Sequence, residues 1–441
     1  MIRLAPINHR ASRCIRLCGV AATLAFVLSF FIGAISCAAS PADNRPKVRA
    51  NTPFINRPKV RAITAFISLD SARYETQISE TMTALKKIKA AYEKAGFEVQ
   101  TLRITTQPFP EYTRSLSDAQ ALDFLKKYDA LAAKDGFDAS IGAAMLHEGD
   151  NPHEARLLGQ IIASTKILEG NIVIAADDGI HWDAIPAAAS LIHYLGANSV
   201  GGLGNFRFAA IAMVPPNTPF YPASYQMNGD HTFAVGLQSA NVIAAALAST
   251  RDPQKAQLVI ENSLGRWARE IEAIGKRAGE ETGWKYSGID LSPAPLKEVS
   301  IGTAIENFTR EPMGSSGTLA TVALITGALK KIPVMRTGYS GLMLPVLEDS
   351  IIAQRWSEGR LSMDSLLLFS SVCGTGLDVI PMPGDTTEAQ IEPILKDVAS
   401  LAYKWHKPLS ARLLPVAGKK AGEQTEFQDP FMVNAKIQSV P

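Results

Sequence analysis

From Val60 onward the chain alternates between segments with strand patterning and segments with helix patterning, and this alternation restricts its fold more than any other feature. The first segment, residues 60–69, is rich in β-branched residues and apolar at almost every alternate position, which predicts a strand. Residues 79–94 then place apolar residues at helical spacing among Lys and Glu, which predicts a helix. Because parallel strands are joined through crossover helices, such alternation indicates an α/β fold with a largely parallel sheet.

The same alternation continues to the C-terminus. Further strands are predicted over residues 97–104, 139–146 and 171–175, with short apolar pieces at 342–346 and 377–381. Further helices are predicted over residues 118–132, 154–168, 182–195, 235–247, 254–277, 317–330, 348–356, 362–372 and 388–405. No Pro/Ser-rich linker divides residues 58–441, so we expect one large domain, for which a single α/β barrel is long enough.

The first 36 residues have the composition of an export or membrane-anchoring segment. Four arginines within residues 1–16 precede a stretch from 17 to 42 that holds no charge, the order found in a signal peptide. Residues 34–37, AISC, resemble the lipobox of bacterial lipoproteins, in which Cys37 would be acylated. This predicts a domain anchored in the bacterial cell envelope, outside the cytoplasm and in contact with the membrane. A signal anchor, a secreted form and a misassigned start of a cytoplasmic protein are the alternatives.

The segment NRPKVRA occurs at residues 44–50 and again at 56–62, so we interpret residues 37–57 as a linker with a duplicated segment. Without the four N-terminal arginines the formal charge of +2 becomes −2, from 40 basic and 42 acidic residues. No basic cluster remains that would indicate a nucleic-acid partner. The four cysteines are too few for a disulfide scaffold.

Glycine-rich turns near the predicted strand ends supply candidate anion-binding residues. Asn205 and Arg207 follow the turn GGLG, where an arginine can hold a carboxylate or phosphate through two hydrogen bonds, or form a structural ion pair instead. Gly317 and Thr318 open a helix whose free amides favour an anion, although the lysine of a P-loop is missing.

A second candidate anion loop lies near the C-terminus. Arg412, Lys419 and Lys420 surround two glycines there, an arrangement that suits a negatively charged ligand. Asp385, after a Pro-Gly turn, is a further substrate-binding candidate, and a helix cap formed with Glu388 is its structural alternative.

Three residues are candidates for catalysis. His231 suits general acid/base chemistry, although its neighbours also have the pattern of helix caps. Asp290 ends a predicted strand before a Pro-bracketed turn, where it either acts as an acid or binds the amides of its own turn. Cys373, the one cysteine beyond residue 37, is either a nucleophile or an inert buried thiol. The seven histidines have no metal-ligand spacing, so no metal site is predicted and the sequence specifies no cofactor.

A set of short motifs resembles the domain of unknown function 711 family, also called uncharacterised protein family 0210. The resemblance extends over residues 58–441 and rests on the segments 60–70, 204–208, 289–295, 340–349, 372–378 and 415–422. It implies a ten-stranded α/β barrel similar to that of pyruvate formate-lyase and other glycyl radical enzymes, and a homo-oligomer with no assigned reaction. Cys373 and the loop from Arg412 to Gly418 are the positions that could correspond to the radical machinery. The Arg-to-Gly spacing differs from the radical signature, which argues against radical chemistry.

The sequence therefore predicts an enzyme that acts on a small anionic metabolite inside the barrel. The anion would be held by Arg207, Gly317, Lys419 and Lys420, and the chemistry would come from Asp290, His231 and Cys373. The alternative is a non-catalytic ligand-binding or scaffold protein of the envelope, which needs only the anion loops.

Overall fold

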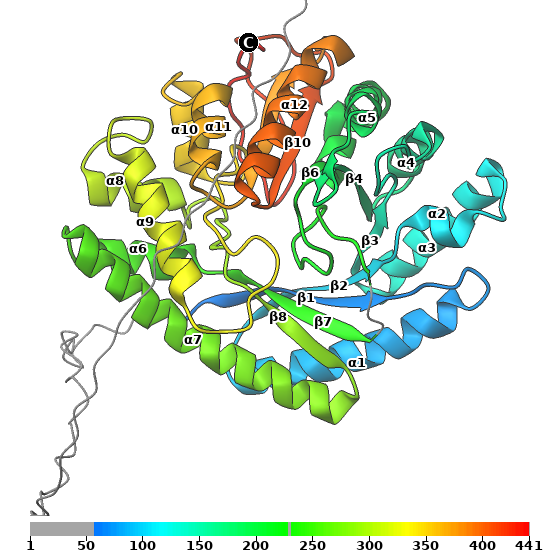
Figure 1. The fold of residues 1–441 in the computed structure, drawn as a ribbon, viewed down its shortest axis with the longest axis horizontal. Helices are drawn as coiled ribbons and strands as arrows, with labels where there is room; N and C mark the ends of the chain where they lie inside the picture. Colours follow the sequence, from blue (N-terminus) through cyan, green and yellow to red (C-terminus); the bar gives the residue numbers. More distant parts are fainter. Residues whose placement is uncertain (1–56, 228–230, 441) are drawn as a thin grey trace, which may run out of the picture. The chain divides into compact units, whose positions relative to one another are not determined.

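The structure is a computed structural model that describes residues 57–227 and 231–440. At its centre is a ten-stranded sheet with the order β8-β7-β1-β2-β3-β4-β6-β10-β9, in which the short β5 pairs with β4. Helices lie around the outside of these strands (Figure 1). The strands are β1 (Lys59–Ile67), β2 (Val99–Thr106), β3 (Asp138–Ala143), β4 (Leu168–Ala176), β5 (Gly179–Ile180), β6 (Phe208–Ala212), β7 (Thr232–Gln238), β8 (Lys285–Asp290), β9 (Gly376–Pro383) and β10 (Leu409–Val416).

The sheet consists of parallel groups that run in opposite directions. Strands β1, β2, β3, β4 and β6 are parallel to one another. The pairs β7/β8 and β10/β9 are each parallel internally but join the central group through antiparallel contacts, β7 with β1 and β10 with β6. The predicted largely parallel sheet is found: six of the nine strand pairings in the described residues are parallel, and only those of β7 with β1, β10 with β6 and β5 with β4 are antiparallel.

The two edge strands of the sheet, β8 and β9, do not pair with each other. The segment 335–346 lies between them instead: the Ile289 amide of β8 donates to the Met335 carbonyl at 2.8 Å, and the Val346 amide donates to the Asp378 carbonyl of β9 at 3.0 Å. The predicted α/β class is confirmed. A sheet closed into a barrel by strand pairing is not found among the described residues, because this segment forms only isolated contacts with the edges.

The helices are α1 (Tyr74–Lys94), α2 (Phe109–Thr113), α3 (Asp118–Asp135), α4 (Pro152–Ser164), α5 (Ala184–Asn198), η1 (Val200–Arg207), α6 (Ala240–Ala248), α7 (Pro253–Thr282), α8 (Ile301–Thr309), α9 (Thr318–Lys331), α10 (Ser350–Ser357), α11 (Met363–Ser370) and α12 (Glu388–Trp405). Every predicted helix is present at least in part, and the structure adds α2, η1 and α8, which the sequence pattern did not predict. The predicted helix over 235–247 is wrong in its first part, which belongs to β7. A fully buried apolar run has no polar face, so its period does not distinguish strand from helix.

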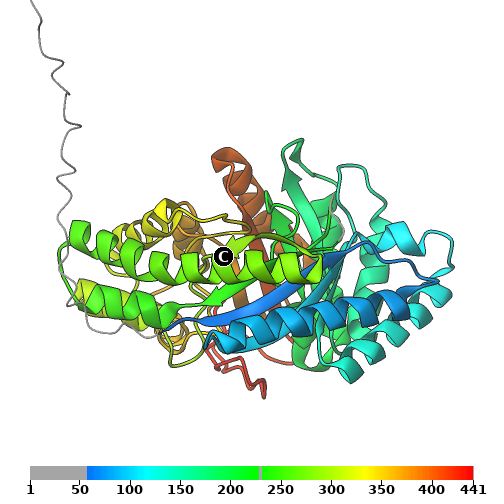
Figure 2. The same ribbon diagram turned by 90° about the horizontal axis from the view of Figure 1, so that it is seen from below.

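The long helices α1 and α7 cover part of the outer face of the sheet and lie alongside each other (Figure 2). The buried Tyr92 of α1 donates its hydroxyl to the Ile271 carbonyl of α7 at 3.1 Å. Their apolar stripes, such as Ile78, Leu85 and Ile88 on α1, are fully buried against the strands. This outer layer is an ordinary hydrophobic core, so polar side chains that could bind a ligand are expected on the inner face of the sheet.

The inner face of the sheet is polar where the loop of residues 213–227 occupies it. Ser140 of β3 donates to the Ser224 carbonyl at 2.7 Å, and Asn171 of β4 donates to the Pro222 and Ser224 carbonyls, each at 2.9 Å. Thr64 of β1 donates to the Pro219 carbonyl at 3.3 Å. These hydrogen bonds fix an interior loop inside the curve of the sheet, and Tyr221 at its tip borders the cavity described below.

Backbone contact between the segment 335–346 and the start of β9 requires glycine on both sides. An added Cβ on Gly341 would lie 2.5 Å from the Gly374 Cα. We predict that Gly341→Ala lowers the free energy of unfolding in urea by about 1–3 kcal/mol, because neither backbone can give way. Gly327→Ala in α9, where an added Cβ meets nothing within 4 Å, is the control and should be neutral or stabilising. Equal effects of the two substitutions on the free energy of unfolding would contradict a close backbone contact between Gly341 and Gly374.

Candidate functional site

A cavity of about 160 Å³ lies on the inner side of the sheet and is lined by charged and aromatic side chains. We call it the main cavity. A second space of about 20 Å³, the small compartment, lies next to it and shares Phe220, Tyr221, Met343 and Arg412 with it. Seven charged residues border these two spaces and form what we call the charged cluster: Arg61, Arg103, Asp138, Glu169, Glu348, Asp378 and Arg412.

Four members of the charged cluster come from neighbouring parallel strands: Arg61, Asp138 and Glu169 lie at the beginnings of β1, β3 and β4, and Arg103 lies in the middle of β2. Arg103 of β2 is in register with Asp138 of β3, and Glu169 of β4 is in register with Ser140, two residues further along β3. Side chains on one face of a sheet alternate with period two, so these positions project to the same inner side. Arg61 reaches that side through a bulge, since the register of β1 against β7 shifts between Val60 and Ala62.

Arg412 of β10 is the most completely paired member of the cluster. Its Nε lies 2.6 Å from Asp378 Oδ1 and its Nη2 lies 3.1 Å from Glu348 Oε1. The guanidinium also stacks over the Phe206 ring, 5.0 Å from the centroid. Burial alone would lower the pKa of Arg412, but Asp378 and Glu348 more than offset this and raise it overall. Burial raises the pKa of Glu348, and Arg412 opposes that rise. Arg412 therefore serves its own carboxylates and is not free for a ligand.

Arg103 is only partly paired. Its Nε lies 3.5 Å from Asp138 Oδ2 and 3.1 Å from Thr101 Oγ1, and its Nη1 donates to the Pro219 carbonyl at 3.4 Å. Its guanidinium lies 4.6 Å from the centre of the Tyr221 ring. The interior loop thus holds Arg103 at the wall of the cavity.

Arg61 forms no ion pair with any residue of 57–227 or 231–440. Its Nη1 donates to Gln100 Oε1 at a long 3.4 Å, and its guanidinium stacks on Phe431, 5.0 Å from the ring centroid. Burial, together with the charge of Arg103, lowers the pKa of Arg61. A half-buried guanidinium with donors left over is a strong site for a carboxylate or phosphate.

Glu169 is the acidic residue in the cavity that lacks a partner. Its carboxyl accepts no hydrogen bond from the described residues, although it lies among them at the cavity wall. Burial raises the pKa of Glu169 to about 8, with Asp138 adding to the rise and Arg103 opposing it. Glu169 therefore holds a proton at neutral pH and can exchange it near that pH, as a general acid or base must.

The three predicted catalytic residues are not brought together, and each has a structural environment. His231 is exposed at the start of β7, edge-on to Trp284 at 5.1 Å between centroids. Its neighbour Thr232 pairs with Phe66, five residues from Arg61, or about 16 Å along the strand at roughly 3.3 Å per residue. His231 thus lies toward the opposite end of β1 from the charged cluster.

Asp290 is fully buried and clamps the segment 335–346 to the end of β8. Its carboxylate accepts hydrogen bonds from the Ser292 amide and hydroxyl and from the Tyr339 and Ser340 amides, at 2.6–3.0 Å. Burial raises the pKa of Asp290, and these hydrogen bonds oppose the rise. Because every approach to the carboxylate is occupied by backbone or by Ser292, its role here is structural.

Cys373 is 1% exposed and belongs to the hydrophobic core rather than to either cavity. The buried Lys407 donates to the carbonyls of Ser370 and Cys373 at the end of α11, so the cation caps that helix end through backbone atoms. The thiol is thus placed as a packing group.

The predicted anion-binding residues other than Arg412 lie outside the two cavities. Asn205 is fully buried and donates to the Ile192 carbonyl at 3.0 Å. Arg207 donates to the carbonyls of Ile162, Thr165 and Leu168 at 2.6–3.0 Å, which occupies its guanidinium at the end of α4.

The glycine loops have similar structural roles. Gly317 is the N-cap of α9 with φ of 97°, and the Thr318 hydroxyl accepts from the Gly314 amide at 3.1 Å. Lys419 pairs with Glu426 at 2.9 Å, whereas Lys420 and Asp385 are exposed on adjacent loops joined by the Gly384 amide and the Lys419 carbonyl. Of the residues predicted from sequence, Arg412 alone borders the main cavity.

The residues that sequence patterns did not identify are Arg61, Arg103, Asp138, Glu169, Glu348 and Asp378. A signal was available: Arg61 directly precedes the apolar run of β1, Arg103 is the one charged residue of β2, and Glu169 directly follows the first residue of β4. In open α/β sheets, binding residues are expected at the C-terminal ends of the strands, whereas Arg61, Asp138 and Glu169 lie at N-terminal ends. Strands β7 to β10 run in the opposite direction to β1 to β4. The charged N-terminal ends of β1 to β4 therefore lie at the same edge of the sheet as the C-terminal ends of β7 to β10.

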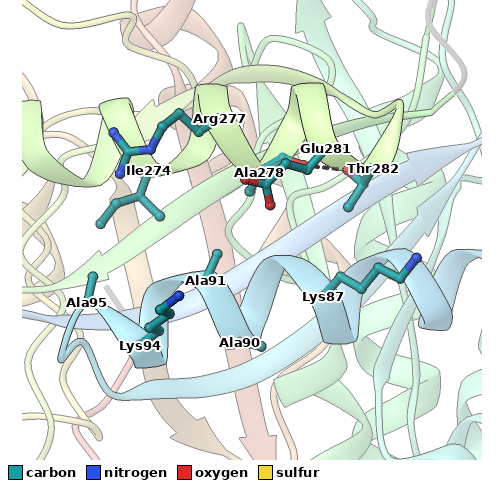
Figure 3. A pocket seen from close by; sticks show the side chains of 10 residues that line it. All are labelled: Lys87, Ala90, Ala91, Lys94, Ala95, Ile274, Arg277, Ala278, Glu281 and Thr282. Carbon is teal, nitrogen blue, oxygen red and sulfur yellow. Dashed lines mark hydrogen bonds between the residues drawn. The ribbon is translucent and has the colours of Figure 1, made fainter.

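A larger cavity, of about 600 Å³, is a groove on the outer surface between α1 and α7. Figure 3 shows that Ala90, Ala91 and Ala95 line it together with long charged side chains from both helices, among them Lys87 and Arg277. Its charges project from helices rather than converge on one point. It lacks the few convergent, buried polar groups of a specific small-molecule site, so the smaller inner cavity is the better candidate.

Comparison with known proteins identifies the family. The model of the family described as "Uncharacterised ACR (DUF711)" matches residues 53–429. The chain belongs to the DUF711 family. A UPF0210 protein of Pyrobaculum aerophilum is 30% identical over 377 residues, covering 79% of this chain and 83% of the relative. A UPF0210 protein of Methanococcoides burtonii is 29% identical over 349 residues, covering 75% and 77%. These names assign no activity to the DUF711 family members.

The predicted signal peptide, lipoprotein and membrane partner are contradicted. The DUF711 match begins at residue 53, and within residues 57–227 and 231–440 no helix combines the length and apolarity needed to cross a membrane. Residues 1–36, Cys37 and the duplicated linker up to residue 56 lie outside the described residues. Membrane attachment is therefore not part of the function proposed below. In the same described ranges, no group of three or more His, Cys, Asp or Glu side chains is arranged to hold a metal ion.

The raised pKa of Glu169 has a measurable effect on stability. The Glu169 carboxyl ionises near pH 4.3 when unfolded but near pH 8 when folded, so native stability is lost as the pH rises through this window. We predict that Glu169→Gln matches the wild type near pH 5 and exceeds it by about 2–4 kcal/mol near pH 9, because one pKa unit corresponds to about 1.4 kcal/mol.

Urea unfolding at both pH values measures this difference. Glu80→Gln, on the exposed face of α1, is the matched control and should show no pH-dependent difference from the wild type. A constant difference between wild type and Glu169→Gln over this range would contradict the assigned protonation.

Proposed function

We propose that this DUF711 protein is an enzyme that binds a small anionic metabolite in the main cavity and transfers a proton to or from it through Glu169. The observation that supports this most directly is Arg61, a half-buried cation at the cavity wall without an ion pair among the described residues. Isolated buried charge is costly, and a ligand carboxylate or phosphate would neutralise it.

The dimensions of the main cavity restrict the ligand. A cavity of about 150 Å³ can hold a benzene-sized molecule, so a space of about 160 Å³ suits a metabolite with on the order of six to ten non-hydrogen atoms. Arg61 and Arg103 both border it and present guanidinium groups for two parallel hydrogen bonds to one anion. Phe206, Tyr221 and Phe431 supply the apolar walls that exclude water.

Glu169 makes the site suited to catalysis as well as to binding. A neutral carboxylic acid at pH 7 can donate a proton to a developing negative charge and later recover it. A ligand-binding protein would need Arg61 but not an acid poised near neutral pH, which is the observation that favours the enzyme over the non-catalytic alternative.

Removal of the Arg61 guanidinium tests the binding site. We predict that Arg61→Ala lowers the affinity for the anion by at least about tenfold, since a hydrogen bond to a charged group contributes about 1.5–3 kcal/mol. The wild type is first screened by thermal shift against a panel of small carboxylates and phosphate esters. Arg266→Ala is the matched control, because Arg266 also stacks on an aromatic ring, that of Trp267 at 4.3 Å, but lies on the exposed outer surface.

Product analysis with the same panel tests catalysis. Glu169→Gln should retain anion-induced stabilisation and lose turnover, because the amide keeps the shape and cannot donate the proton. No stabilisation of the wild type by any anion of the panel, or equal stabilisation of Arg61→Ala, would contradict the proposed binding site. Binding without turnover in the wild type would favour the ligand-binding alternative.

A further inference from the structure

The small compartment is lined by more polar atoms than the protein itself satisfies. Thr375 is 1% exposed, yet its Oγ1 has no hydrogen-bond partner among the described residues. Asp378, also in the wall, gives its Oδ1 to Arg412 Nε at 2.6 Å, and its Oδ2 accepts no hydrogen bond from the described residues. Ser410 donates its hydroxyl to the Thr375 carbonyl at 3.0 Å, and Tyr339, also in the wall, has a buried hydroxyl with no hydrogen-bond partner among the described residues. Buried polar groups of this kind are normally satisfied, by protein or by bound water.

The size and charge of the compartment define its occupant. One water needs about 10–15 Å³, so about 20 Å³ holds one water and nothing much larger. Asp378 already forms an ion pair with Arg412, so a neutral occupant is favoured over an ammonium or metal ion. Thr375 Oγ1, Asp378 Oδ2 and the Tyr339 hydroxyl are available for the two to four hydrogen bonds that a buried water requires.

We infer that the small compartment holds one water molecule and that this water is a reactant, so that the enzyme hydrolyses its anionic substrate. The inference rests on the proposed function of the main cavity, with which the compartment shares Arg412, Tyr221, Phe220 and Met343. Because the two spaces share these four lining residues, a substrate anion held by Arg61 and Arg103 in the main cavity would lie next to the water.

Asp378 and Glu169 can supply both proton transfers that the hydrolysis requires. The water oxygen forms a bond to an electrophilic carbon of the substrate, and one water proton passes to Asp378 Oδ2. The bond from that carbon to its leaving group breaks, the electron pair goes to the leaving atom, and that atom takes the proton of Glu169. The products are an alcohol or acid and the protonated leaving group, after which Asp378 returns its proton and Glu169 regains one from solvent. The step thus uses Asp378 to accept the water proton and Glu169 to donate to the leaving group.

Thr375→Val is the sharpest test, because valine has the shape of threonine but no hydroxyl. We expect Thr375→Val to keep the anion-induced thermal stabilisation of the wild type and to lower turnover of the panel compounds by at least about tenfold. Thr375→Ser, which retains the hydroxyl, should stay close to the wild-type rate. Product formed in oxygen-18-labelled water should contain one labelled oxygen per turnover.

The outcomes separate this inference from the function on which it rests. If the wild type binds no anion of the panel, the proposed function is overturned. Retained binding with unlabelled product, or with wild-type turnover in Thr375→Val, overturns hydrolysis alone. High-resolution crystal structures without ligand test the water site itself. Electron density for a water at hydrogen-bond distance from Thr375 Oγ1 is expected in the wild type and not in Thr375→Val. An empty compartment in the wild type would overturn the water site.

Discussion

Charge enclosed on the inner face of the sheet has to be neutralised or hydrogen-bonded, and much of the described structure is arranged around that requirement. Arg412 connects β10, β9 and the residue before the cap of α10 through its contacts with Asp378 and Glu348. Arg103 is held by Asp138 and by a carbonyl of the interior loop. Arg61 alone among the three arginines lacks a carboxylate partner in the described residues, so the same requirement that organises the fold also defines the place for a ligand.

Neighbouring acidic residues show how local backbone position decides between structure and chemistry. Glu348 and Asp349 are adjacent, yet Glu348 faces Arg412 whereas Asp349 is fully buried and accepts hydrogen bonds from the amides that begin both α8 and α10. Asp290 has a similar clamping role between β8 and the segment 335–346. The interior acids with saturated hydrogen bonds, Asp290 and Asp349, thus maintain the fold, whereas Glu169 accepts no hydrogen bond from the described residues and is the acid to which the proposed function assigns proton donation.

The sequence was sufficient to predict the α/β class and most helices and strands, because amphipathic period and turn residues are local properties. It predicted one member of the charged cluster, Arg412, as part of a loop motif, although the residue lies in β10. Arg61 and Glu169 could not be recognised as neighbours, because strand order and the antiparallel joins that bring them to one edge are long-range features. Conversely, His231, Asp290 and Cys373 have the residue types of a catalytic set, but only the fold shows that each lies in a different environment.

Membership of the DUF711 family assigns no reaction. The proposed proton transfer depends most directly on the protonation of the Glu169 carboxyl. A carbon-13 NMR titration of glutamate carboxyl groups, with Glu169 assigned by comparison with Glu169→Gln, measures it directly. The account predicts a Glu169 carboxyl that remains protonated at neutral pH and titrates near pH 8. A Glu169 carboxyl that titrates at the ordinary value of about 4.3 would contradict it, because the cavity would then hold a fixed anion instead of a proton donor.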